Sequence, residues 1–442
     1  MGLHQLLQER EAKNAPVRVG VIGAGKFGSM FLSQVIRIPG VHVLGIVDLD
    51  VQQAKSNLAN VHWEAERFSA SSFEEACKNG TSHVGDSYEA LVQSSAIDVI
   101  VEATGNPVVA ADHVLAAFAN GKHVVSATVE LDSFAGLAVA NEARSAEVIY
   151  SMAFGDQPAM TCDLVDWART CGFKVAAAGR GHKWKPEFRF STPDTIWEHW
   201  GVPREVAERG RMNPKMFNSF LDGTKPAIES AAIANACGLD VPSAGLTYPL
   251  GAIDDIPNLM RPNAVGGALE HSGMVEVING LKPDGSEFDH NIRMGVFVVV
   301  ETETEYQKKC LEEYKVKTDD TGRFMCLYKQ WHLIGLELGM SVASVGIRAE
   351  ATGVAREFRG DVVAVAKRNL KAGEMLDGEG GYTVAGQLRP AATSLAGNML
   401  PLGLTGNVRL LRDVAVDKVL TYDDVELDES ITAVKLRRSQ ET

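Results

Sequence analysis

The chain has 442 residues, of which 45% are hydrophobic and 7% aromatic, so it is long enough to form two or three domains with packed cores. Its formal net charge is −14 and it contains no basic block, which argues against nucleic acid and anionic membranes as partners. A small anionic substrate would therefore need a local cluster of basic side chains.

The cysteines, the apolar runs and the N-terminal residues bear on the compartment. The six cysteines form no CxxC pair and no metal-like spacing with histidine, which is typical of reduced thiols. No apolar run approaches the roughly twenty residues that span a bilayer. Residues 1–14 lack the apolar core of a signal peptide. We expect a cytoplasmic protein.

The most informative segment is an apolar strand at residues 18–22, followed by a glycine-rich turn and a helix expected at residues 26–37. The turn has the pattern GxGxxG and consists of Gly23, Ala24, Gly25, Lys26, Phe27 and Gly28. Gly23 permits a tight turn, Gly25 lets a pyrophosphate approach the backbone, and Gly28 lets the helix pack closely on the strand. The helix N-terminus would present its unpaired N–H groups to the phosphates. The pattern predicts a dinucleotide cofactor.

The choice between NAD and NADP depends on Asp48. This residue ends a second apolar strand, Val41 to Val47, about twenty residues after the turn, where a ribose-binding acid is expected. Its carboxylate accepts hydrogen bonds from ribose hydroxyls and repels a 2′-phosphate, which favours NAD. Lys55 lies one or two helical turns later and could offset that repulsion. The residues alone leave the choice open.

Short apolar strands then alternate with helices up to residue 151, a pattern typical of a Rossmann-type, doubly wound parallel sheet in an α/β protein. Strands are expected at residues 97–103, 123–127 and 148–151, and helices at residues 88–93, 108–120 and 133–146. Residues 61–82 are polar and are expected to form an irregular insertion. Thr104, Gly105 and Asn106 lie at the carboxyl edge of the sheet, where such folds bind ligands. Pro107 is equally typical of a helix start.

Three domains are predicted: a cofactor domain at residues 1–153, a middle domain at residues 154–352 and a small β-rich domain at residues 353–442. The middle region mixes helices and strands without repeating βαβ units, as in an α+β substrate domain. Its longest helix is expected at residues 216–237, and its strands at residues 174–178, 274–278 and 292–300. We expect the middle domain to form a homodimer.

A tight basic cluster follows the strand expected at residues 174–178, in an otherwise acidic chain. Its members are Arg180, His182, Lys183 and Lys185. Arginine and lysine suit the oxygens of a phosphorylated substrate, although charged loops are also commonly just solvated. Lys183 is the candidate catalytic residue, because an ammonium beside a carbonyl stabilises a developing alkoxide and supplies a proton. His182 is the alternative, and Asp156 is either an orienting acid or a helix N-cap.

Further candidates lie later in the chain. Asp254 and Asp255 could hold a divalent cation such as Mg²⁺ or Mn²⁺, although paired acids before a proline are at least as often a turn. Arg261, Lys329 and His332 are additional candidate substrate ligands.

Two strands resemble those of homoserine dehydrogenases. Residues 99–105 read Val-Ile-Val-Glu-Ala-Thr-Gly, and residues 121–127 read Gly-Lys-His-Val-Val-Ser-Ala. In that family the second strand ends in a catalytic lysine, which is absent from the corresponding residues 127–130. The family's helical Gly-x-Asp-x-x-x-Lys pattern resembles residues 223–229 and implies Lys225 and Glu229 as substrate-binding residues, with acid and base exchanged. The exchange counts against homoserine as the substrate.

The final residues, with a Lys-x-Gly-Glu turn at 371–374 and Asp-Asp-Val at 423–425, resemble a SAF domain. Together with the Rossmann start, the Gly-Asp-Gln-Pro-Ala turn at 155–159 and the basic segment at 179–184, they make the whole chain similar to the bacterial DXR-like enzymes. That resemblance implies a reductoisomerase that converts 1-deoxy-D-xylulose 5-phosphate to 2-C-methyl-D-erythritol 4-phosphate with NADPH, or with NADH as the alternative.

Two other functions stay open, because proteins that share an architecture need not share an activity. One is a homoserine-dehydrogenase-like oxidoreductase of another small hydroxy acid or sugar phosphate. The other is a cofactor-binding sensor without turnover, whose C-terminal domain contacts a partner.

Overall fold

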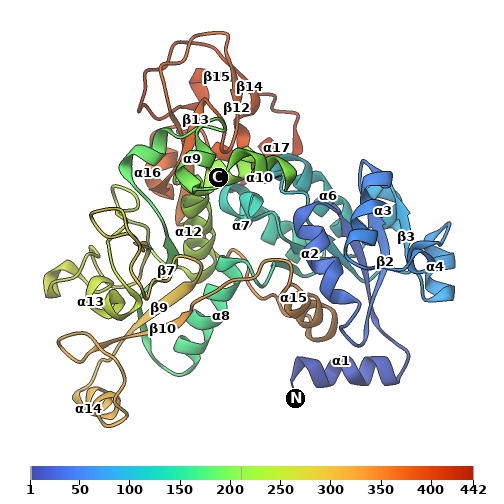
Figure 1. Ribbon diagram of the computed structural model, residues 1–442, viewed down its shortest axis with the longest axis horizontal. Coiled ribbons are helices and arrows are strands. Elements are labelled where there is room, and N and C mark those ends of the chain that lie inside the picture. Colours follow the sequence, from blue (N-terminus) through green and yellow to red (C-terminus); the bar gives the residue numbers. More distant parts are fainter. Residues whose placement is uncertain (1, 211, 442) are drawn as a thin grey trace. The chain divides into compact units, whose positions relative to one another are not determined.

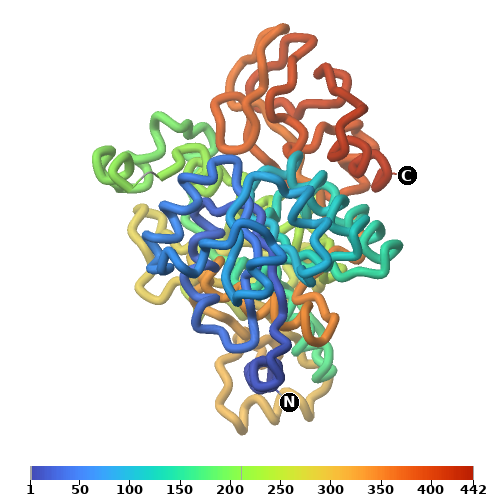
Figure 2. Tube along the Cα trace, turned by 90° about the vertical axis from the view of Figure 1, so that its right-hand side faces the viewer, coloured from blue at the N-terminus to red at the C-terminus, as the bar shows by residue number. Residues whose placement is uncertain are grey.

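The computed structural model (Figures 1 and 2) describes residues 2–210 and 212–441. The chain divides into two compact units. Unit 1 comprises Met1–Met160 and Leu333–Ala355, and unit 2 comprises Thr161–His332 and Arg356–Thr442. The predicted division into three domains, including a separate SAF-like domain, stays a prediction.

Unit 1 is built on a six-stranded parallel sheet with the strand order β3-β2-β1-β4-β5-β6. Its strands are β1 (Val17–Ile22), β2 (Val41–Val47), β3 (His83–Gly85), β4 (Val99–Glu102), β5 (His123–Ser126) and β6 (Tyr150–Met152). The strand order reverses at β1, which pairs with both β2 and β4. This is the strand order of the Rossmann fold, and the predicted α/β class is confirmed.

The helices of unit 1 follow the predicted alternation with shifted ends. They are α1 (Leu3–Ala12), α2 (Lys26–Val35), α3 (Val51–Asn60), α4 (Phe73–Asn79), α5 (Tyr88–Gln93), α6 (Pro107–Ala119), α7 (Val129–Ser145), α15 (Gly339–Ala343) and the first residues of α8 (Gln157–Thr170). The prediction that residues 61–82 are irregular was wrong, because they contain α4 and a 3-10 helix at Ala65–Phe68. The Ser72 side chain accepts a hydrogen bond from Glu75 N and caps α4.

Unit 2 contains a four-stranded mixed sheet with the order β10-β9-β7-β8 and two small antiparallel sheets, β11-β13 and β12-β14-β15. The strands are β7 (Lys174–His182), β8 (Met274–Asn279), β9 (Val296–Glu301), β10 (Phe324–Lys329), β11 (Gly360–Ala366), β12 (Met375–Asp377), β13 (Val384–Pro390), β14 (Gly406–Leu410) and β15 (Val425–Glu426). In Figure 2 the trace after residue 360, coloured orange to red, forms one group.

The helices of unit 2 include two where one was predicted. They are α9 (Ile196–Trp200), α10 (Arg204–Arg209), α11 (Pro214–Leu221), α12 (Thr224–Cys237), α13 (Ile256–Leu259), α14 (Glu305–Glu313), α16 (Ala391–Ala396) and α17 (Thr432–Gln440). The single helix predicted at residues 216–237 is wrong, because Gly223 adopts a φ of +88° between α11 and α12. A left-handed residue of this kind ends one helix and lets the chain start another in a new direction.

Helix α12 lies between two sheets of unit 2. It packs on β7 and β8 and also on β11 and β13 (Figure 1). Every residue of α12 except Lys225 is buried, and most of these residues are alanine or another small residue. Small side chains let the strands on both sides approach the helix closely, so α12 forms the centre of this unit.

The C-terminal helix α17 is anchored by a buried ion pair. The guanidinium of Arg437 donates to both carboxylate oxygens of Asp361 on β11, at 2.9 and 2.6 Å, and to Glu441 at 2.7 Å. Both Arg437 and Asp361 have no exposed surface. Burial of the charges is costly, and the bidentate geometry compensates for that cost.

We expect Arg437→Met to lower the free energy of unfolding by about 3–5 kcal/mol, because it leaves Asp361 buried without its positively charged partner and with only the Ser394 hydroxyl as a side-chain donor. Urea unfolding followed by circular dichroism measures this change. Lys435→Met, which alters an exposed residue of the same helix, should leave the midpoint nearly unchanged. Equal midpoints for the two variants would show that the ion pair does not hold α17.

Candidate functional site

The glycine-rich turn of unit 1 lies at the reversal of strand order, between the carboxyl ends of β1 and β4. Gly23 has a φ of +94°, and a Cβ atom there would lie 2.9 Å from the Ala103 carbonyl oxygen. A Cβ atom at Gly28 would lie 2.1 Å from the Gly23 carbonyl oxygen, so α2 packs directly on the turn. At Gly25 a Cβ atom would meet no other heavy atom within 4 Å. The backbone is therefore open at the position where a pyrophosphate would approach.

Asp48 ties the end of β2 to the glycine-rich turn. Its Oδ2 accepts a hydrogen bond from Ala24 N at 2.8 Å, and its Oδ1 accepts one from Asp50 N at 3.1 Å. A carboxylate has about four acceptor positions, so two remain for ribose hydroxyls. The open backbone at Gly25 and the carboxylate at the end of β2 fit the phosphate and ribose of a dinucleotide.

Glu102 joins the loops that follow β4 and β5. Its buried carboxylate accepts hydrogen bonds from the hydroxyls of Thr104, at 2.5 Å, and of Thr128, and lies 3.4 Å from His113 Nδ1. The Thr128 hydroxyl in turn accepts a hydrogen bond from Gly105 N at 3.0 Å. The Glu102 carboxylate thus holds the turn that follows β4 in place, directly through Thr104 and indirectly through Thr128. Our sequence reasoning missed this role, although a glutamate that ends an apolar strand was a usable signal.

The next residue, Asn106, serves as the N-cap of α6. Its Oδ1 accepts hydrogen bonds from Val108 N and Val109 N, and Pro107 occupies the first helical position. A helix start and a ligand-binding turn are compatible at this edge of the sheet.

A second buried acid, Asp132 on α7, was also missed. It has no exposed surface and lies beside the buried hydroxyl of Tyr150. Burial raises the pKa of Asp132 well above 3.8, and the carboxylates of Asp156, Glu130 and Glu102 raise it further, while the Tyr150 hydroxyl opposes them. Asp156 itself accepts a hydrogen bond from Gln157 N at 2.9 Å at the start of α8. The carboxyl edge of this sheet therefore holds a set of buried acids.

In unit 2 the basic cluster begins inside β7 and not in a loop. The expected strand end at residue 178 was wrong, because β7 continues to His182. Arg180 and His182 lie two residues apart on this strand and so point to the same face. Arg180 forms an ion pair with Glu229 of α12, and both side chains are buried. The guanidinium charge is therefore compensated within the protein.

His182 is a buried, neutral imidazole. Its Nε2 has no hydrogen-bond partner among the described residues. Burial lowers the pKa of His182 well below 6.5, and the charges of Arg180 and Lys183 lower it further. The ring is therefore uncharged near neutral pH.

Lys183 and Lys185 follow β7 directly and are half-buried. No hydrogen bond or ion pair of the Lys183 side chain is found within the described part of the chain. The Lys185 ammonium lies 5.9 Å from the centroid of the Phe188 ring. Lys225 lies in the first turn of α12, on the same helix as Glu229. Within the described residues neither Lys183 nor Lys185 forms an ion pair, whereas the charge of Arg180 is compensated by Glu229.

The remaining candidates make contacts of their own. Arg261 Nη1 donates to Asp319 at 2.5 Å, Lys329 Nζ donates to Asp163 at 3.2 Å, and His332 Nδ1 lies 2.6 Å from the Met294 carbonyl oxygen. None of these contacts joins Arg261, Lys329 or His332 to β7 or α12.

The paired acids proposed as metal ligands also have protein partners. Asp255 accepts a hydrogen bond from Ala252 N at 2.9 Å, and Asp254 lies 3.6 Å from His290 Nδ1. Among residues 2–210 and 212–441, no group of three or more His, Cys, Asp or Glu side chains is placed to hold a metal ion. Within the same residues, no helix has the length and apolar character needed to cross a bilayer.

Two family comparisons match most of this architecture. Residues 17–127 match the oxidoreductase family with an NAD-binding Rossmann fold. Residues 155–338 match the catalytic domain of the oxidoreductase DRL. No curated protein matches the chain. The chain is thus an NAD(P)-binding oxidoreductase, with the glycine-rich turn in the first matched segment and the β7 cluster in the second.

Solved structures resemble the chain distantly. The Bacillus subtilis protein yvaA is 13% identical, with 77% of this chain and 91% of that chain covered and a TM-score of 0.36. An NAD binding oxidoreductase from Klebsiella pneumoniae is 13% identical, with 74% and 68% covered and a TM-score of 0.31. A myo-inositol dehydrogenase from Corynebacterium glutamicum is 12% identical, with 41% and 48% covered and a TM-score of 0.27. This chain spans about half the length of the last protein, and similarity at this level carries no inference about substrate.

The open backbone at Gly25 leads to a prediction about the cofactor. Gly25→Ala should fold normally, since its φ of −71° suits alanine, but its methyl group should weaken NADPH binding roughly tenfold or more, or about 1.4 kcal/mol. Gly28→Ala, the matched variant, should instead lower the free energy of unfolding by about 1–3 kcal/mol, because its methyl group meets backbone. Nicotinamide fluorescence titrations and thermal melts separate the two effects. Unchanged NADPH affinity in Gly25→Ala would place the cofactor elsewhere.

The neutral state of His182 leads to a prediction about pH. The unfolded chain binds a proton at this residue below pH 6.5, while the folded chain does so only at a lower pH. The free energy of unfolding should therefore fall as the pH falls below 6.5, by up to about 1.4 kcal/mol per pH unit. His182→Asn should remove this part of the pH dependence, and His271→Asn, at an exposed residue, should not. Urea unfolding between pH 5 and pH 7 tests this, and identical pH profiles for all three proteins would refute a depressed pKa.

Proposed function

We propose that this oxidoreductase is a DXR-like reductoisomerase, which converts 1-deoxy-D-xylulose 5-phosphate to 2-C-methyl-D-erythritol 4-phosphate. The observation that carries the proposal is the match of residues 155–338 to the DRL catalytic domain, because this segment includes the basic end of β7 and all of α12. A phosphorylated substrate needs a local cation in a chain of net charge −14, and Lys183 and Lys185 supply two.

NADPH is the proposed cofactor, with NADH as the alternative. Its pyrophosphate would lie over Gly25 at the N-terminus of α2, and its ribose would lie beside Asp48. When bound, the reduced nicotinamide supplies a hydride. The negative charge of Asp48 disfavours a 2′-phosphate, so the preference between the two cofactors depends on a nearby cation such as Lys55.

Lys183 is the proposed catalytic residue. The rearrangement of the substrate's carbon skeleton produces an aldehyde, and reduction of this aldehyde gives the alcohol. As hydride reaches the carbonyl carbon, negative charge develops on the oxygen, and the Lys183 ammonium stabilises this charge and donates the proton. Arg180 is excluded from this role by its ion pair with Glu229, and His182 by its lowered pKa.

A divalent cation such as Mg²⁺ remains part of the proposal. It would polarise the vicinal oxygens of the substrate during rearrangement, and Asp254 and Asp255 are the residues proposed to bind it. We also propose that the protein is cytoplasmic and that it forms a homodimer. Light scattering of the purified protein tests the homodimer.

The second candidate function is a homoserine-dehydrogenase-like oxidation or reduction of another small hydroxy acid or sugar phosphate, without rearrangement. Its support is the position of Lys225 on α12, where that family carries a substrate-binding residue; Glu229 of the same pattern is already paired with Arg180. The lysine that the family carries after its second strand is absent here, so homoserine is not the proposed substrate.

The proposed reaction is tested with purified protein, 1-deoxy-D-xylulose 5-phosphate and NADPH or NADH, with Mg²⁺ present or chelated. Absorbance of the reduced nicotinamide follows turnover, and NMR identifies the product. Formation of the branched methylerythritol phosphate supports the reductoisomerase. Cofactor binding without oxidation would exclude this substrate, and a panel of hydroxy acids and sugar phosphates then distinguishes the second candidate from a sensor.

Lys183→Met should reduce kcat by at least about 100-fold and leave NADPH affinity near that of the wild type, because the lost group acts on the carbonyl oxygen. Steady-state kinetics and a nicotinamide fluorescence titration measure the two quantities. Lys282→Met, at a lysine of the same unit that is half-buried like Lys183, is the matched control and should retain full activity. Full activity in Lys183→Met would remove this lysine from the mechanism.

A further inference from the structure

Unit 2 contains a cavity of about 130 Å³ that the proposed reaction does not yet use. One part of its wall comes from the DRL-like segment, through Trp184, Asp222, Gly223 and Tyr248. Another part comes from the C-terminal segment, through residues 385–388 of β13. Two regions far apart in the sequence therefore build one cavity.

Two polar atoms converge on this cavity above Gly223. The rings of Trp184 and Tyr248 are stacked, with centroids 4.5 Å apart and planes inclined by 11°. A Cβ atom at Gly223 would lie 3.3 Å from the Tyr248 hydroxyl oxygen and 3.4 Å from Trp184 Nε1. Because Gly223 has no side chain, the space between these atoms stays open. Trp184 Nε1 is buried and has no hydrogen-bond partner among the described residues.

The backbone of Tyr248 is also unusual. Its φ is +53°, a left-handed conformation that is rare for a large aromatic residue. Such conformations persist where the surrounding structure holds them, and they cluster at ligand-binding and active sites. The conformation places the Tyr248 ring against Trp184.

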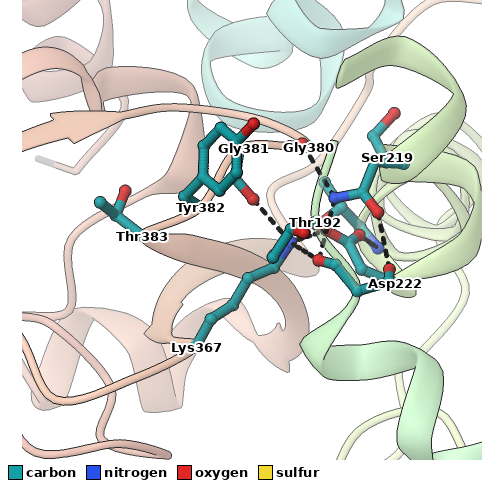
Figure 3. Close-up of polar contacts among 12 residues, drawn as sticks. Thr192, Ser219, Asp222, Lys367, Gly380, Gly381, Tyr382 and Thr383 are labelled. Carbon is teal, nitrogen blue, oxygen red and sulfur yellow. Dashed lines mark hydrogen bonds and ion pairs between the residues drawn. The ribbon is translucent and has the colours of Figure 1, made fainter. Parts of the chain in front are cut away.

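Asp222 is held in the cavity wall by Lys367, which follows β11. The Lys367 ammonium lies 2.5 Å from Asp222 Oδ2 and donates to the carbonyl oxygens of Ser191, at 2.8 Å, and Gly381, at 2.9 Å (Figure 3). These three contacts use all three of its donors. Both side chains are almost completely buried. Lys367 is therefore a positioning residue that fixes Asp222 next to Gly223.

A second contact joins the two parts of the wall. The Thr224 hydroxyl, in the first turn of α12, accepts a hydrogen bond from Gly386 N of β13 at 2.7 Å. Together with the Lys367–Asp222 pair, this contact fixes β13 to the start of α12. The C-terminal segment thus completes the cavity.

We propose that this cavity binds the hydroxylated end of the substrate, a short polyol chain, and that the C-terminal segment is required to form the site. An indole N–H only donates and a carboxylate only accepts, whereas a hydroxyl group does both. The stacked aromatic rings suit the C–H surface of a polyol. The two charged residues that line the cavity are both paired, Asp222 with Lys367 and Arg189 with Asp417, so the wall carries no uncompensated charge that would select an inorganic anion. The inference rests on the proposed function only in assuming a small hydroxylated substrate.

The test is an NMR titration of the full chain labelled with ¹⁵N-tryptophan, with erythritol as the probe. Trp184→Phe identifies the Trp184 indole signal, and Trp331, which is exposed on a different segment, provides an internal control. Erythritol should shift the Trp184 signal in a saturable manner and leave the Trp331 signal in place. Inorganic phosphate should not shift the Trp184 signal. A Trp184 signal that moves with phosphate and not with erythritol, or with neither, would overturn the proposal.

The role of the C-terminal segment is tested by removing its buried pair as a unit. Asp222→Asn/Lys367→Met avoids leaving one charge buried alone, and it should weaken erythritol binding at least tenfold. The matched variant Lys371→Met/Asp413→Asn removes an exposed pair of the same segment and should bind erythritol as the wild type does. Unchanged binding in the first variant would overturn the positioning role. If that variant fails to fold, the titration of the wild-type chain still decides whether the cavity binds a polyol.

These outcomes are independent of the proposed reaction. A chain that reduces 1-deoxy-D-xylulose 5-phosphate but shows no erythritol shift would keep its function and lose this site. A chain that shows the shift but does not reduce that substrate would keep the site and lose the reductoisomerase assignment.

Discussion

The burial of α12 on both sides is the constraint on which unit 2 depends. Because β7 and β8 cover one side and β11 and β13 another, a charged residue inside this helix needs a buried partner. Glu229 finds it in Arg180 of β7. Arg180, which the sequence predicts as a phosphate ligand, therefore holds α12 to the sheet. The cationic role near the end of β7 passes to Lys183.

The start of α12 is determined by the same packing. The left-handed Gly223 lets α12 begin in a new direction after α11, and Lys367 and Gly386 bind the residues on either side of it to the C-terminal segment. The elements that hold the helix in place are thus the elements that line the cavity. In unit 1 the corresponding constraint is the glycine-rich turn, where close packing at Gly23 and Gly28 leaves only Gly25 open.

Much of unit 1 could be predicted because its information is local. Apolar strands, helix caps and the GxGxxG pattern lie within short stretches of sequence, and the alternation of strands with helices predicted the doubly wound parallel sheet. The strand order and the short strand β3 were not predicted. Unit 2 was harder. A single glycine does not interrupt the helical spacing of apolar residues, so the break between α11 and α12 at Gly223 was missed. Charged residues at the end of an apolar strand resemble a loop, so Arg180 and His182 were placed outside β7. The pairing of Asp222 with Lys367 joins residues far apart in the sequence, and no local pattern reveals it.

The central claim is that the chain transfers a hydride from a nicotinamide to a substrate carbonyl, and isotope transfer tests it most directly. The protein is supplied with NADPH that carries deuterium at C4 of the nicotinamide, on either face, and with 1-deoxy-D-xylulose 5-phosphate. The account predicts one deuterium in the product, on the carbon of the reduced carbonyl, from one of the two labelled cofactors only. NADPH oxidation without deuterium in the product, from either face, would contradict it.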